Sequence, residues 1–151
     1  MKVEQDIKLK NLIAFVGEKS KFYQNVFQNN EIELSAINSQ EDLSKLPFTS
    51  KDDLALYNED FLCVDESEIV DYVSTSGTLA SPVSFYLTQN DLDRLAVNEK
   101  ASFQLAGCTS ADVFQMMVTM DKQFMAGLAY YLGVKALGAG VIRQGPGGLE
   151  S

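Results

Sequence analysis

The second half of the chain carries a strand, helix and strand pattern that restricts the folds open to it. The almost wholly apolar run "DVFQMMVTM" at 112–120 predicts a strand buried on both faces. The stretch "FMAGLAYYLGVKALG" at 124–138 predicts a helix, and "AGVIR" at 139–143 predicts a second strand. Two strands joined by one helix normally pair in parallel with a right-handed crossover, so we expect part of an α/β sheet.

The first half reads as helical. Residues 4–28 predict one amphipathic helix, because apolar residues recur there at steps of three and four: Leu12, Phe15, Val16, Tyr23, Val26 and Phe27. Residues 40–57 predict two short helices separated by Pro47. The second of them should be capped by Thr49 or Ser50, with Asp53 completing a capping box.

The middle of the chain predicts a hairpin followed by a helix. "EIVDYVS" at 68–74 and "VSFYL" at 83–87 alternate like strands and are joined by a loop. Thr88 and Asp91 then open a helix that Gly107 should end. Its expected buried stripe consists of Leu92, Leu95, Ala96, Phe103 and Ala106.

Composition excludes several classes of function. At 151 residues with 46% hydrophobic side chains, the chain can bury one ordinary core, so we expect one compact unit. A net charge of −9 argues against a nucleic-acid partner. No apolar run is long enough to cross a bilayer and the first ten residues are polar, so we expect a cytoplasmic protein without a membrane partner.

Few catalytic side chains are available. The sequence contains no histidine, which excludes Ser-His-Asp and Cys-His catalysis and the usual zinc sites. Cys63 and Cys108 are far apart and have no C-x-x-C spacing, so they read as small buried apolar residues. We therefore assign no metal ligand.

The hairpin loop is open to two interpretations. Thr75, Ser76, Gly77 and Thr78 combine a glycine with hydroxyl residues, which suits a loop whose amides and hydroxyls bind a phosphate. The same residue types are ordinary turn formers, so the loop could simply reverse the chain. It is not a Walker loop, because the second glycine and the lysine of that motif are missing.

A family resemblance bears on that choice. The loop "STSGTLASPV" resembles the phosphate-binding signature of the adenylate-forming (AMP-binding) enzymes. The stretches "KFYQNVF", "DLSKLPFTSKDDL", "YLTQNDLDRLA" and "FMAGLAYYLGVKALGAGVI" fall in the order that phenylacetate-CoA ligase and its relatives show. The resemblance covers nearly the whole chain but only about the first third of such a ligase.

The resemblance implies a fold and a domain assignment. The fold would be α/β, the N-terminal part of the acetyl-CoA synthetase-like large domain, with a β-hairpin carrying the phosphate loop and a partial parallel sheet. Residues 1–151 would form a single N-terminal fragment of the large AMP-binding domain. The remainder of that domain and the C-terminal domain would be absent.

The resemblance also implies an activity. A carboxylic acid, phenylacetate-like or another aryl or acyl acid, would be adenylated by ATP and then joined to coenzyme A as a thioester. The full-length enzyme would use ATP, Mg²⁺ and coenzyme A, with the small acid and coenzyme A as partners. The family's catalytic residues fall beyond Ser151, so we assign none here and expect the fragment alone to be inactive.

In this family pattern Thr75, Ser76, Gly77 and Thr78 would hold the β- and γ-phosphates. The loop departs from the pattern after them. Leu79 replaces a threonine, Ala80 replaces a second glycine, and Ser81 or Val83 stands where a lysine is often found. Loss of the lysine matters most, because a charge-assisted contact contributes about 1.5–3 kcal/mol and a neutral hydrogen bond about 1 kcal/mol.

Four further residues are candidates by position. Lys122 follows the predicted strand and could replace the missing lysine, although a solvated surface lysine is the alternative. By the family pattern Phe124, Gly127 and Leu128 would lie where the acyl group and the adenylate approach. Plain packing is their alternative role.

Other functions stay open. The altered loop is consistent with a non-catalytic binding or interaction module on the same scaffold, and a related enzyme could pass the acyl group to a different acceptor. An incomplete sheet leaves a strand edge and an apolar face exposed, so we also expect a homo-oligomer.

Overall fold

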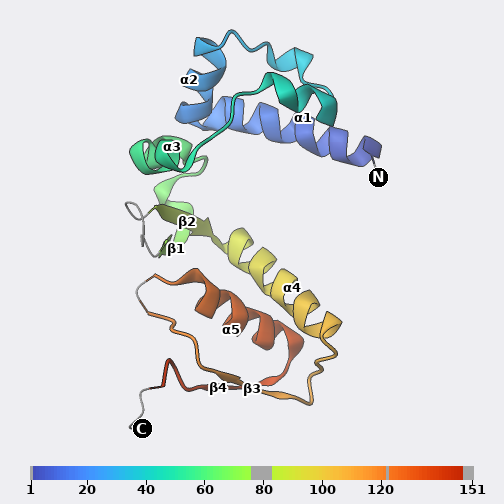
Figure 1. Cartoon of the computed structure of the whole chain (residues 1–151), viewed down its shortest axis with the longest axis vertical. Helices are drawn as coiled ribbons and strands as arrows, with labels where there is room; N and C mark the ends of the chain where they lie inside the picture. The colour runs from blue at the N-terminus through green and yellow to red at the C-terminus, as the bar shows by residue number, and fades with distance from the viewer. Residues whose placement is uncertain (1, 76–82, 122, 148–151) are drawn as a thin grey trace. The chain divides into compact units, whose positions relative to one another are not determined.

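The computed structural model describes residues 2–75, 83–121 and 123–147 (Figure 1). The chain forms two compact units, residues Met1–Glu66 and Ser67–Ser151, where composition suggested one. Each unit has its own secondary structure and its own packed contacts.

The first unit is helical. Its elements are α1 (Lys2–Lys19), α2 (Lys21–Asn29), η1 (Leu34–Ala36), η2 (Gln40–Lys45), α3 (Lys51–Leu56) and η3 (Asn58–Phe61). Aromatic rings hold the end of this unit against α2. The ring of Phe22 stacks on that of Phe61 at a centroid distance of 4.0 Å, and Tyr23 meets Phe61 edge to face at 5.7 Å.

The prediction of a single helix over 4–28 is wrong, because Ser20 ends one helix and begins another. Ser20 has an extended backbone, and its Oγ accepts a hydrogen bond from the N–H of Tyr23 at 3.3 Å. The same hydroxyl donates to the carbonyl oxygen of Asp60 at 2.9 Å. The buried serine is thus the N-cap of α2 and links it to η3.

The two short helices on either side of Pro47 are confirmed, the first as the 3₁₀ helix η2. Ser50 is the cap of α3: its Oγ accepts from the N–H of Asp53 at 3.1 Å, and the Asp53 carboxylate accepts from the N–H of Ser50 at 2.8 Å. The Ser50 hydroxyl also donates to the Asp53 carboxylate at 2.7 Å, and this bond and that from the Ser50 N–H lower the pKa of Asp53. The Thr49 hydroxyl lies 3.1 Å from that of Tyr23 and takes no part in the cap.

The second unit opens with the expected hairpin. After η4 (Glu66–Glu68), β1 (Ile69–Ser74) pairs antiparallel with β2 (Ser84–Thr88). Ser74 is opposite Ser84 and Val73 is opposite Phe85, with a register shift between Ile69 and Asp71. Val73 is buried, in agreement with the alternation of the sequence.

The helix after the hairpin is also confirmed as α4 (Gln89–Leu105). The Thr88 Oγ1 accepts from the N–H of Asp91 at 3.4 Å, and the Asp91 carboxylate accepts from the N–H of Thr88 at 3.0 Å. Gly107 follows with φ of +87°, a conformation that glycine adopts without strain. The predicted stripe is half-buried except for Ala106, which is exposed because α4 ends one residue earlier.

The strand, helix and strand pattern is confirmed. β3 (Val113–Met116) and β4 (Gly140–Arg143) pair in parallel, with α5 (Met125–Leu137) between them in the chain. The ring of Phe103 in α4 lies 4.8 Å from that of Phe114 in β3, and α5 runs beside α4 (Figure 1). The expected α/β class is therefore correct.

The length and burial predicted for the first of these strands are wrong. Only four residues of the apolar run pair with β4, and their burial alternates rather than covering both faces. Met116 is buried, whereas the side chain of Val113 is 67% exposed. Val113 and Gln115 of β3 are exposed, and so are Gly140, Ile142 and Arg143 of β4.

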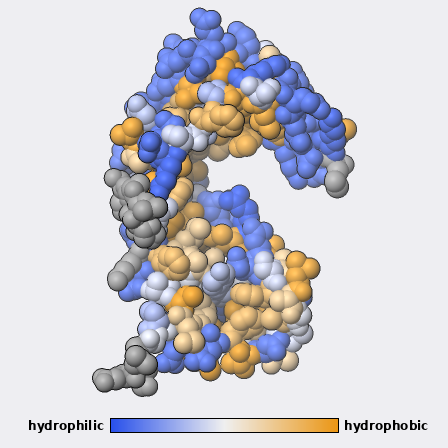
Figure 2. All heavy atoms as spheres, in the orientation of Figure 1, coloured by the Kyte–Doolittle hydropathy of each residue, from blue (hydrophilic) through white to orange (hydrophobic). Residues whose placement is uncertain are grey.

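Large apolar side chains are exposed on both units, as Figure 2 shows by hydropathy. Both cysteine thiols are free and half-buried, and burial raises the pKa of Cys63. Among the helices that the structure describes, none combines the length and apolar character needed to cross a membrane.

Candidate functional site

The base of the predicted phosphate loop is closed by Thr75 and Val83. The Thr75 N–H donates to the Val83 carbonyl oxygen at 3.0 Å, and the Thr75 Oγ1 accepts from the Val83 N–H at 3.0 Å. The Thr75 amide is thus engaged, while its hydroxyl proton is left for another acceptor. The remaining loop candidates, Ser76, Gly77 and Thr78, lie outside the described residues, as do Leu79, Ala80 and Ser81.

A second hydrogen bond ties the hairpin to the segment between β3 and α5. The Ser74 N–H donates to the Gln123 carbonyl oxygen at 3.0 Å. Gln123 has φ of +59°, a left-handed conformation that costs a non-glycine residue free energy. Lys122 itself lies outside the described residues. Its neighbour Gln123 is held at the mouth of the hairpin, which is the point where β1 ends at Ser74 and the loop begins.

The three candidates at the start of α5 differ in burial. Phe124 is the N-cap residue and its side chain is 40% exposed, whereas Leu128 is half-buried. Gly127 is buried against the carbonyl oxygen of Thr119, at a separation that leaves no room for a Cβ atom. The structure therefore gives Gly127 a definite packing role.

A pocket that sequence reasoning missed lies at the carboxyl ends of β3 and β4. It has a volume of about 360 Å³ and is lined by Met116, Val118, Met120, Arg143, Gln144 and Gly145. The available signal was the place of Arg143 at the end of a predicted parallel strand. Ligands of α/β sheets bind outside the carboxyl ends of such strands.

Arg143 is the one charged residue among those described around this pocket. Its guanidinium carbon lies 5.7 Å from the centroid of the Tyr131 ring, in a cation–π arrangement. The backbone N–H groups of Gln144 and Gly145 both donate to the Met116 carbonyl oxygen, at 3.0 and 3.1 Å. The side chains, rather than these amides, are therefore free to contact a ligand.

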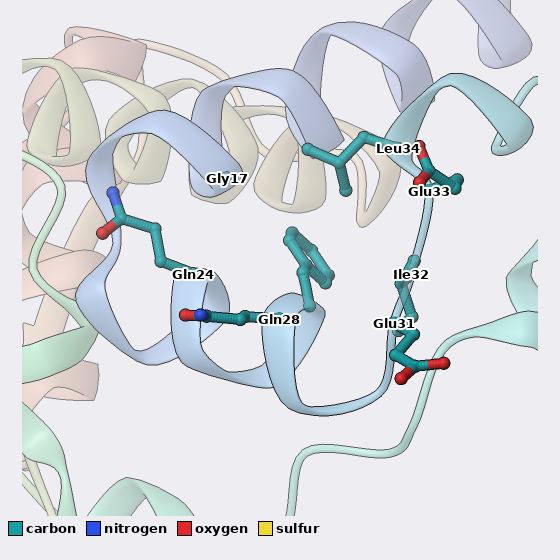
Figure 3. Close-up of a pocket in the computed structure, with 8 residues that line it drawn as sticks. Gly17, Gln24, Gln28, Glu31, Ile32, Glu33 and Leu34 are labelled. Carbon is teal, nitrogen blue, oxygen red and sulfur yellow. The ribbon is translucent and has the colours of Figure 1, made fainter.

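The helical unit has a larger hollow of about 710 Å³ between α1, α2 and the segment that follows α2 (Figure 3). Gln24, Gln28, Glu31 and Glu33 supply its polar lining. The Gln24 side-chain amide donates to the Glu18 carbonyl oxygen at 2.7 Å. Two carboxylates and no cation among the described lining residues make this hollow a poor site for a nucleotide or an acid.

Carboxylates are numerous, but in the part of the chain that the structure describes they do not form a metal-binding cluster. No three Asp, Glu or Cys side chains there are grouped closely enough to hold an ion. We therefore assign no residue of the described chain to Mg²⁺.

The fold is that of the coenzyme A ligases. Over 96% of this chain it matches a crystal structure of the open conformation of 2-hydroxyisobutyryl-CoA ligase, in complex with 2-HIB-AMP and CoA, with a TM-score of 0.84. Sequence identity is 22%, and the match covers 34% of that chain. The thioesterification state of the same ligase matches with a TM-score of 0.86.

By sequence the chain is related to the phenylacetate-coenzyme A ligases. It is 30% identical over 139 residues to that ligase from Thermus thermophilus, covering 91% of this chain and 31% of the relative. With the Escherichia coli enzyme it shares 29% over 147 residues, covering 97% of this chain and 33% of the relative. No protein-family model matches the chain.

The resemblance to this family is thus confirmed, and the chain spans about one third of the length of the curated relatives it matches.

Proposed function

We propose that this chain forms the phosphate-binding part of an ATP-dependent acid–coenzyme A ligase, within the large domain of that enzyme. The observation that carries the proposal is the hydrogen bond from Ser74 to Gln123, which brings the hairpin mouth to the segment before α5. This contact puts the end of β1, which leads into the signature loop, next to the residue that precedes the candidate acyl residue Phe124. The family relationship supports the reaction type.

In the first step, an oxygen of the acid's carboxylate attacks the α-phosphorus of ATP and pyrophosphate leaves, giving an acyl-adenylate. The thiol of coenzyme A then displaces AMP to form the thioester. Amide and hydroxyl donors that face the β- and γ-phosphates stabilise the charge that builds on the leaving group.

We assign that role to Ser76, Gly77, Thr78 and the hydroxyl of Thr75. Thr75 acts through its hydroxyl proton, because its amide already donates to the Val83 carbonyl oxygen. Lys122 would add the positive charge that the loop lacks. Mg²⁺, when bound with ATP, would neutralise part of the phosphate charge.

Phe124, Gly127 and Leu128 are proposed to border the acyl group and the adenylate. The exposed ring of Phe124 offers an apolar surface at the start of α5. Gly127 acts indirectly, since its close packing on Thr119 sets the position of that helix start.

The test is binding of Mg-ATP to the chain by isothermal titration calorimetry. We expect heat that disappears in Gly77→Val and persists in Gly147→Val, because a Cβ atom added at Gly147 would meet no heavy atom within 4 Å. Equal heat in both variants would overturn the assignment of the loop. We expect no thioester from the chain alone with phenylacetate, ATP and coenzyme A.

Two alternative functions would give different results in activity assays. A non-catalytic binding module, favoured by Leu79 and Ala80, would show no adenylation even when the chain is joined to the rest of a ligase. An enzyme with a different acyl acceptor would release pyrophosphate without forming a coenzyme A thioester.

Self-association and a cytoplasmic location complete the proposal. Val113 and Ile142 are exposed on the small parallel sheet, at 67% and 53%, and such apolar surface favours a homo-oligomer. A strictly monomeric mass by light scattering would argue against it. The small acid, ATP and coenzyme A that the reaction needs are metabolites of the cytoplasm.

A further inference from the structure

We propose that the pocket at the carboxyl ends of β3 and β4 binds a small apolar carboxylate, and that Arg143 is the residue that recognises its negative charge. This inference rests on the proposed function, and it adds a specificity-determining residue for the acid. The loop signature and the candidates at the start of α5 do not include Arg143.

The walls of the pocket suit an apolar body. Met116 is buried, and Val118 and Met120 complete an apolar surface in which thioether side chains adapt to irregular shapes. The volume of about 360 Å³ lies within the range of small-molecule sites, which are mostly apolar with a few polar groups that fix orientation.

The charge of Arg143 is not neutralised by a carboxylate in the described part of the chain. The other arginine, Arg94, pairs with Asp91 at 3.0 Å, whereas no Asp or Glu there lies within ion-pair distance of Arg143. The face of Tyr131 supports the guanidinium, and its N–H donors are left for an anion. An arginine that lies beside an apolar cavity supplies a local positive charge that attracts the carboxylate of an apolar acid.

A carboxylate suits this site better than a phosphate. Phosphate sites gather several donors, often successive backbone amides. Here the amides of Gln144 and Gly145 are already bonded to Met116, which leaves one guanidinium and the Gln144 side chain. One arginine can hold one carboxylate through two parallel hydrogen bonds.

The pocket is also joined to the proposed phosphate site. Met120, which lines it, and Gln123, which accepts from Ser74, belong to the same segment before α5. An acid held here would lie against the segment that meets the hairpin mouth.

The experiment is an NMR titration of the ¹⁵N-labelled 151-residue chain with three probes: phenylacetate, its neutral analogue phenylacetamide, and pyrophosphate. We expect phenylacetate to shift the amides of Met120 and Gly145 and to bind about tenfold more tightly than phenylacetamide. Its affinity should fall about tenfold in Arg143→Gln and less in Arg143→Lys, and it should be unchanged in the control Arg94→Gln.

Several results would overturn the inference. They are the absence of phenylacetate binding, equal binding of phenylacetamide, or an unchanged affinity in Arg143→Gln. Pyrophosphate that shifts the same amides at lower concentration would assign the pocket to phosphate instead. If Arg143→Gln fails to fold by circular dichroism, the comparison of the two phenyl probes on the unaltered chain still decides.

This outcome is separate from that of the proposed function. Pyrophosphate binding at the hairpin loop is tested by Gly77→Val, and Gly77 is not one of the residues that line the Arg143 pocket. The proposal for the hairpin loop and the proposal for the Arg143 pocket can therefore each be disproved without the other.

Discussion

The carbonyl oxygen of Thr119 occupies the space that a side chain on Gly127 would need. This contact joins the segment after β3 to the first turn of α5, and it is a contact of backbone with backbone. Neither partner can move aside by changing a rotamer, so the position of the helix start depends on a glycine at this site.

Gly127→Ala should therefore destabilise the chain by about 1–3 kcal/mol, the usual cost of forcing an extra methyl group into a packed interior. Urea unfolding followed by circular dichroism measures this. The matched control is Gly147→Ala, where an added Cβ would meet no heavy atom within 4 Å. A loss for Gly127→Ala no larger than that for the control would mean that the helix start adapts.

Ser20→Ala should cost about 2 kcal/mol, because it removes a helix cap and leaves buried groups without their hydrogen-bond partner. The Ser20 hydroxyl serves both the N–H of Tyr23 and the carbonyl oxygen of Asp60. Ser50→Ala, which removes an exposed cap, is the comparison and should cost about 1 kcal/mol. Equal losses would show that the link to Asp60 contributes nothing.

Asp42 should make stability depend on pH in the acid range. Lys45, 2.6 Å from the carboxylate, and the backbone N–H groups of Asn38 and Ser39 hold the pKa of Asp42 well below its usual range. A carboxylate with a lowered pKa in the folded state stabilises the fold above its unfolded pKa of about 3.9, and this contribution is lost as the pH falls through the folded pKa.

Asp42→Asn should therefore destabilise the chain clearly at pH 6 and by a smaller amount at pH 3. Urea unfolding at the two pH values measures the difference, with the exposed Asp52→Asn as control. The same loss at both pH values would contradict the role given to the Asp42 charge.

Cys63 should react slowly in the folded chain. Burial raises the pKa of its thiol, and the Sγ donates to the Phe61 carbonyl oxygen at 3.4 Å. Since the thiolate is the reactive form, alkylation by iodoacetamide at pH 8 should be several-fold slower than in urea. A Cys108→Ser variant isolates the signal of Cys63, and equal rates in the two conditions would show that the thiol is not protected.

Local signals in the sequence predicted much of the second unit and the start of α3 in the first unit. Thr88 with Asp91, Ser50 with Asp53, and Gly107 mark helix ends through side-chain and backbone chemistry that acts within a few residues. The hairpin and the parallel pair follow from alternation and from chain connectivity, which are also local.

Two predictions that were wrong concern features that depend on contacts with residues further along the chain. The apolar pattern runs through Ser20 without a change of period, and the break is fixed by a hydrogen bond to Asp60, forty residues away. The run at 112–120 is apolar throughout, but only Val113–Met116 has a partner strand in β4.

The candidate site also has one part that local sequence predicts and one part that it does not. The loop residues carry a recognisable composition, whereas the pocket around Arg143 combines residues from two strands and the segments that follow them. Its one local clue is an arginine at a strand end, and that clue does not show whether a carboxylate neutralises the charge.

The central claim is that the hairpin loop binds the phosphates of a nucleotide. The most direct test is a ¹⁵N NMR titration of the chain with pyrophosphate. We predict that the largest shifts fall on the amides of Ser76, Gly77 and Thr78 and that Gly77→Val abolishes them. Shifts elsewhere with none in this loop, or the same shifts in the variant, would contradict the claim.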